Sequence, residues 1–127
     1  MRPETSAIVL KWFSRQHAHE LYSSSVSVAE IFYGVELFPA GKRRNELLAG
    51  AERMFANVLA GRVFAFEDEA ARAFARIASV RRKAGRPIAE MDARIAAIAD
   101  VHGATLATRN TADFEGCGIR LVNPWRD

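Results

Sequence analysis

The chain has 127 residues, half of them hydrophobic, which suits one domain with a substantial core. No apolar run is long enough to span a membrane, and the N-terminus lacks the layout of a secretory signal, so we expect a cytoplasmic protein. The single cysteine, Cys117, excludes an internal disulfide and a cysteine-rich zinc site. A net charge of +3 permits nucleic-acid binding but does not require it.

Helices and strands alternate along the first half of the chain. Apolar residues recur at helical spacing in three segments, and proline and glycine mark their ends. Two short runs between them have the composition of strands. In chain order we expect a helix over 3–16, a strand over 20–24, a helix from Ser27 to about Phe38, a helix over 42–60 and a strand over 62–66.

The second half continues this alternation. Acids at 67–69 open a helix whose apolar face carries Ala70, Phe74, Ile77 and Val80, and basic residues close it near Lys83. A further helix is expected over 89–101, with strands over 104–107 and 119–122. This order predicts an α/β fold of three layers, α/β/α, with a mostly parallel central sheet.

Acidic and polar residues follow the strands at several points. Asp92 lies in the first turn of a helix, and Glu30 has the same setting upstream. The segment 108–113 directly follows a strand and ends in Asp113. Because these places lie at the carboxyl edge of a parallel sheet, we expect the acids to meet there. Acids from separate segments around one rim predict an oxygen-lined Mg²⁺ or Mn²⁺ site.

The two helical acids also have purely structural interpretations. Ser27 and Glu30 match a capping box, in which the glutamate bonds back to the serine amide. Asp92 could serve the helix dipole, although Glu90 can fill that role. Helical spacing places Asp92 on one face with Ala96 and Ala99, whose small side chains leave space above it.

The polar segment after the strand at 104–107 is open to two interpretations as well. Asn110 and Asp113 could be the cap and third residue of a single helical turn. Thr108 and Arg109 offer a hydroxyl and a guanidinium that suit contacts with phosphate. The densest basic cluster, at 81–86, suits a helix C-terminus better than RNA binding, although Arg81 or Arg82 could contact RNA.

Four motifs together resemble the PIN domain, and specifically the VapC-type toxins of type II toxin–antitoxin pairs, including FitB-like members. The resemblance runs from Met1 to Trp125, so we interpret residues 1–127 as a single PIN-like domain. The motifs are Val28–Ile31 with Tyr33-Gly34, Gly85–Ile88 followed by Asp92, His102-Gly103 with Ala107–Asn110 and Asp113-Phe114, and Asn123–Trp125.

The resemblance implies an endoribonuclease that hydrolyses RNA such as tRNA or rRNA by means of water activated by Mg²⁺ or Mn²⁺. It also implies a homodimer that is silenced by a small antitoxin protein and binds promoter DNA only through that antitoxin. Carried over, Glu30 and Asp92 are metal-site acids. Asn110 stands where some members have aspartate, so we favour Asp113 as the last acid. Thr108, Arg109 and Asn110 then contact the substrate side of the site.

One departure concerns the first acid of the family. PIN domains begin with a strand that ends in an aspartate, and neither is found in this sequence, which resembles an N-terminally truncated domain. We expect a misassigned start or a trimmed chain. The alternative is a catalytically impaired toxin that only binds its antitoxin, through early helices rich in aromatic residues (Trp12, Phe13, Phe32, Tyr33, Phe38 and Phe55).

Overall fold

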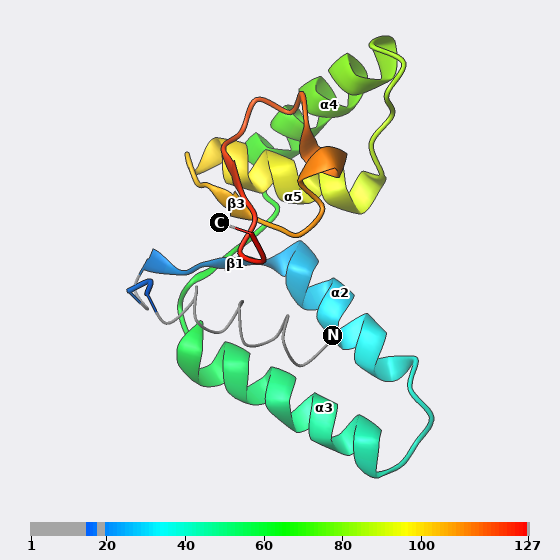
Figure 1. The fold of residues 1–127 in the computed structure, drawn as a ribbon, viewed down its shortest axis with the longest axis vertical. Coiled ribbons are helices and arrows are strands. Elements are labelled where there is room, and N and C mark those ends of the chain that lie inside the picture. Colours follow the sequence, from blue (N-terminus) through cyan, green and yellow to red (C-terminus); the bar gives the residue numbers. More distant parts are fainter. Residues whose placement is uncertain (1–14, 18–19, 127) are drawn as a thin grey trace. The chain divides into compact units, whose positions relative to one another are not determined.

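The computed structural model describes residues 15–17 and 20–126 (Figure 1). The chain divides into two compact units. The smaller unit is Ala18–Ala65, and the larger unit contains Phe66–Asp127 with residues 15–17. Among the described residues, each unit has a parallel strand pair and two α-helices. The helix expected over 3–16 lies outside the described residues, apart from residues 15 and 16, which form a turn.

The smaller unit is built around two short strands. β1 (Ser23–Ser24) pairs in parallel with β2 (Val63–Phe64), and the Tyr22 and Phe64 rings stack beside them with centroids 4.5 Å apart. Between the strands run α2 (Ser25–Glu36), α3 (Lys42–Arg53) and the π-helical turn η2 (Met54–Val58). The single helix expected over 42–60 is therefore confirmed as an α-helix to Arg53 and wrong after it, where the chain widens into the π turn.

Helix α2 begins two residues earlier than its sequence pattern indicated. Its N-cap is Ser24, whose Oγ accepts a hydrogen bond from the Ser27 amide at 3.0 Å. A serine at this position satisfies one of the free amides of the first turn. The capping box expected from Ser27 and Glu30 is wrong, because Ser27 is the third helical residue and Glu30 lies in the second turn.

The larger unit pairs two helices with a second strand pair (Figure 1). α4 (Asp68–Lys83) packs against α5 (Glu90–Val101), and Arg76 of α4 bonds to Asp100 of α5 at 2.7 Å. β3 (Leu106–Ala107) pairs in parallel with β4 (Leu121–Val122), and the 3₁₀-helix η3 (Thr111–Phe114) lies between them in the chain. Both described strand pairs are parallel and alternate with helices, which confirms the α/β fold.

Small residues form the core between α4 and α5. Ala93, Ala96 and Ala97 of α5 have no exposed surface, which lets the helices approach closely. Glycines with positive φ end both helices, Gly85 after α4 and Gly103 after α5. The expected apolar face of α4 is wrong at its last turn, because Val80 is 51% exposed. The buried side is Ala70, Ala73, Ile77 and Arg81.

No helix within the described part of the chain is long and apolar enough to cross a membrane.

Candidate functional site

Asp92 is a half-buried carboxylate in the first turn of α5. Its neighbours on the same face are Ala96 and Ala99, both buried, as the helical spacing predicted. Burial raises the pKa of Asp92 above its ordinary value of 3.8, and the negative charge of Asp113 raises that pKa further. Asp92 is therefore a carboxyl group whose charge is poorly compensated by the protein itself.

Asp113 supplies the second carboxylate of the site from η3, a turn that packs against α5. Its side chain is exposed, and its amide donates a hydrogen bond to the Asn110 carbonyl at 3.0 Å. Twenty-one positions separate the two acids in the sequence, yet each lies within electrostatic reach of the other. The structure thus brings together the two acids that the sequence placed at one sheet edge.

Thr108 and Asn110 form the turn that joins β3 to η3. The Thr108 amide donates to the Val122 carbonyl at 2.9 Å, which extends the β3–β4 pairing to the carboxyl end of β3. The Thr108 Oγ1 accepts a hydrogen bond from the Asn110 amide at 3.1 Å. Asn110 is the N-cap of η3, but its side chain makes no capping bond. The cap is therefore made through its backbone, and the amide side chain is left for other contacts.

Arg109 presents its side chain at the same edge of the larger unit. Its guanidinium carbon lies 5.6 Å from the centre of the Trp125 ring, and its carbonyl accepts a bond from Asn123 Nδ2 at 3.4 Å. Asn123 Oδ1 in turn accepts from the Trp125 amide at 2.9 Å. The sequence assigned no role to Asn123 and Trp125 beyond a common ending of the family, and these contacts show that they support the Arg109 turn.

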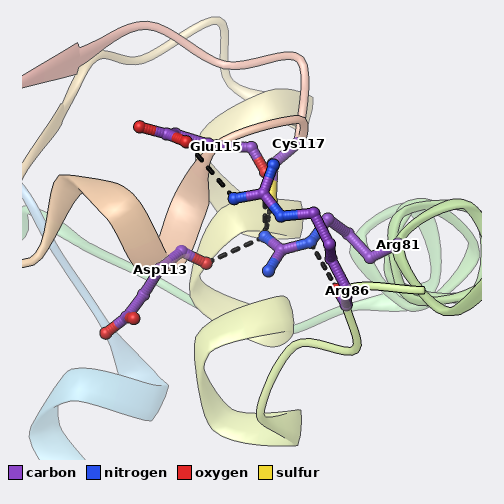
Figure 2. Close-up of polar contacts among 5 residues, drawn as sticks. All are labelled: Arg81, Arg86, Asp113, Glu115 and Cys117. Atoms are coloured by element: carbon purple, nitrogen blue, oxygen red, sulfur yellow. Dashed lines mark hydrogen bonds and ion pairs between the residues drawn. The ribbon is translucent and has the colours of Figure 1, made fainter. Parts of the chain in front are cut away.

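Arg81 is a second residue that the sequence misjudged. It was expected among the basic residues that suit a helix C-terminus, with an RNA contact left open, but the structure buries it, with 6% of its surface exposed, so the RNA contact is wrong for Arg81. Its guanidinium donates to backbone carbonyls of the loop that carries Asp113 (Figure 2). Its position four residues after Ile77, in register with the buried side of α4, is the signal that could have revealed it.

Glu30 lies in the smaller unit, on an exposed part of α2. Within the described residues, the Glu30 side chain makes no hydrogen bond or ion pair. Because it belongs to a different unit from Asp92 and Asp113, its membership of the site stays a prediction.

The pair of aspartates suits a hard divalent cation. Among residues 15–17 and 20–126, no three His, Cys, Asp or Glu side chains gather into a group that could hold a metal ion. Mg²⁺, however, commonly binds through one or two carboxylates and completes its shell with water and substrate phosphates. The negative charge of Asp113 is one cause of the raised pKa of Asp92. A bound cation would offset this repulsion between the two carboxylates.

An α/β fold with acids and a polar turn at the carboxyl end of a parallel strand is the arrangement of a PIN-type nuclease domain. The PIN domain family model matches residues 2–116, and the chain belongs to this family.

Within the family the chain is similar to VapC-type proteins. It is 38% identical over 124 residues to the VapC ribonuclease Y4jK of Sinorhizobium fredii, covering 98% of this chain and 89% of that protein. It is 40% identical to the plasmid stability protein StbB of Pseudomonas syringae pv. tomato, with the same coverage. The crystal structure of FitAcB from Neisseria gonorrhoeae superposes with a TM-score of 0.91 at 34% identity, covering 99% of this chain and 91% of that one. The resemblance noted from the motifs is thus confirmed.

Proposed function

We propose that this protein is the toxin of a toxin–antitoxin pair and acts as a divalent-metal-dependent endoribonuclease. The observation that carries the proposal is the packing of η3 against α5, from which Asp113 acts electrostatically on Asp92 although 21 positions separate them in the sequence. Membership of the PIN family and similarity to a protein named a VapC ribonuclease support the reaction class.

In this proposal Asp92 and Asp113 of the larger unit would hold Mg²⁺ or Mn²⁺, and the metal-site role of Glu30 stays a prediction that the family resemblance implies. When bound, the ion supplies a lowered pKa for the attacking water and neutralises charge that builds on the phosphate oxygens. Arg109 binds the RNA backbone through its exposed guanidinium, which its packing over Trp125 holds in place. Thr108 and Asn110 orient the phosphate from the turn that they share.

We further propose that a small antitoxin protein silences the chain, that the chain is a homodimer, and that it reaches promoter DNA only through the antitoxin. Structures similar to this chain include FitAB bound to a DNA fragment.

Helix α2 and the residues after it expose Tyr33, Leu37 and Phe38, at 65%, 67% and 41%. Large exposed apolar side chains of this kind suit a protein partner. Phe32 and Phe55 are half-buried and pack together, whereas Trp12 and Phe13 lie outside the described residues.

The test is RNA cleavage by the full chain in Mg²⁺ or Mn²⁺, compared between the wild type, Asp92→Asn and Asp113→Asn. We expect each substitution to lower the cleavage rate at least a hundredfold and to weaken Mn²⁺ binding in calorimetry. A matched control is Asp68→Asn, which changes an exposed aspartate in the first turn of α4. This control should cleave RNA and bind Mn²⁺ like the wild type.

Two outcomes would overturn the proposal. If Asp92→Asn and Asp113→Asn cleave RNA as fast as the control, the paired aspartates do not form the catalytic site. If the wild type cleaves no RNA but binds its antitoxin tightly, the protein is the impaired toxin that the sequence left as an alternative.

A further inference from the structure

Arg81 is the most deeply buried charged side chain of the described core, and it makes four contacts through its guanidinium. Nε donates to the Arg86 carbonyl at 2.7 Å, and Nη1 lies 2.9 Å from the carbonyls of Asp113 and Glu115. Nη1 also lies 3.6 Å from the Cys117 sulfur. Among these contacts there is no carboxylate, so three backbone carbonyls and the Cys117 sulfur are the partners of the buried charge.

These contacts join segments that are far apart in the sequence. Arg81 and Asp113 are 32 positions apart, and the loop around Asp113 is otherwise closed by short-range amide bonds, from Asp113 to Asn110, Glu115 to Ala112 and Cys117 to Phe114. Within the described residues, the one other side-chain hydrogen bond or ion pair from α4 and the turn after it to this loop is the exposed pair of Arg86 and Glu115, at 3.2 Å. Exposed ion pairs of this kind contribute little, so Arg81 is the principal link.

The link also restrains the backbone from which the Asp113 side chain projects. In Figure 2 the backbone carbonyl of Asp113 faces Arg81, while its carboxylate points to the opposite side, away from the guanidinium. The Asp113 amide is held as well, by its hydrogen bond to the Asn110 carbonyl, so the backbone is restrained on both sides of the Asp113 Cα. This restraint limits the directions that the Cα–Cβ bond can take, although Arg81 does not touch the carboxylate.

We propose that Arg81 is a positioning residue that sets the metal-binding geometry of Asp113 through the backbone of the loop. The inference rests on the proposed function, because it takes Asp113 to be a ligand of the divalent ion. A planar guanidinium donates along several fixed directions at once, which a lysine ammonium cannot reproduce. The role thus belongs to the shape of the arginine fork and not to its charge.

The experiment compares Arg81→Lys and Arg81→Met with the wild type in the full chain, at a temperature at which all are folded. Hydrogen exchange of the Asp113, Glu115 and Cys117 amides should quicken at least tenfold in both variants, while that of α5 amides stays unchanged. Mn²⁺ affinity, measured by calorimetry without RNA, should fall at least tenfold. Arg81→Lys should rescue little of either loss, although it keeps the charge.

Ile77→Val is the matched control, since it weakens the same buried side of α4 one turn away and leaves the Arg81 guanidinium unchanged. It should leave loop exchange and Mn²⁺ affinity as in the wild type. Unchanged loop exchange in the Arg81 variants would overturn the link itself. Faster loop exchange with unchanged Mn²⁺ affinity would reduce Arg81 to a structural residue. If Asp113→Asn also binds Mn²⁺ normally, it is the assignment of Asp113 in the proposed function that fails.

Discussion

Asp92→Asn should stabilise the metal-free protein at neutral pH, even though it removes a proposed metal ligand. The folded state disfavours the ionised form of Asp92, because burial and the Asp113 charge both raise its pKa. Asparagine has nearly the same shape and carries no charge. Since the site is partly exposed and screened by solvent, we expect a gain of about 0.5–1 kcal/mol. For a chain of this length that is a rise in Tm of roughly 2–5 °C.

The gain should depend on pH in a defined direction. A carboxyl group whose pKa is raised by folding stabilises the folded state while it is protonated, below its ordinary value of 3.8. This stability is lost as pH rises through the raised pKa of the folded state. The asparagine variant does not lose it. The difference in Tm between variant and wild type should therefore be small in acid, grow as pH rises through that window, and stay constant above it.

Thermal unfolding in EDTA across this pH range measures the effect, and Mn²⁺ provides a second reading. At about 100 times its Kd, a ligand adds about 2.7 kcal/mol to the folded state, so the wild type should overtake Asp92→Asn when Mn²⁺ is present. Asp68→Asn should show neither the gain nor the reversal. A variant that is no more stable than wild type in EDTA at pH 7, or a difference that does not change with pH, would refute this reasoning.

Five further substitutions test the fold by urea denaturation. Ser24→Ala removes the cap of α2 and should cost about 1 kcal/mol, whereas Ser24→Asp should keep most of it. Gly34→Ala, inside α2 with open space around the new methyl group, should gain about 0.5–1 kcal/mol; a loss would mean that the position is not plain helix interior. Ile77→Ala, at 2% exposure, should cost about 2–5 kcal/mol, and Val80→Ala, half exposed, far less.

The paired aspartates could be predicted because both of their positions follow from local rules. Asp92 had to lie in the first turn of a helix, and Asp113 had to follow a strand at the carboxyl edge. The buried alanines on the same helix face as Asp92 were likewise encoded in the helical spacing. The helices and the parallel strand pairs followed from the same periodicity, although each strand pair is shorter than its apolar run, because pairing requires a partner as well as an extended chain.

Three features could not be predicted, because in each case the sequence pattern fits more than one residue or more than one structure. Serines at 23, 24, 25 and 27 all suit a cap, and the geometry of the chain entering α2 selects Ser24. The π turn after Arg53 could not be predicted, because the apolar residues there fit the spacing of an α-helix as well as that of a π-helix. Hydrophobicity predicted that Val80 is buried and Arg81 is not. The structure buries Arg81 instead, because carbonyls of a loop that is distant in the sequence give its guanidinium enough hydrogen-bond partners.

The contact between Arg81 and Cys117 gives the protein a built-in chemical probe. Cys117 is the only cysteine in the sequence, and the structure buries its free thiol to 3% exposure beneath the loop. An alkylating reagent can reach the sulfur only when this loop opens, so the rate of thiol labelling measures local unfolding around the Asp113 loop. The unmodified wild-type chain can therefore report, with no engineered label, how a bound cation or protein partner changes the order of that loop.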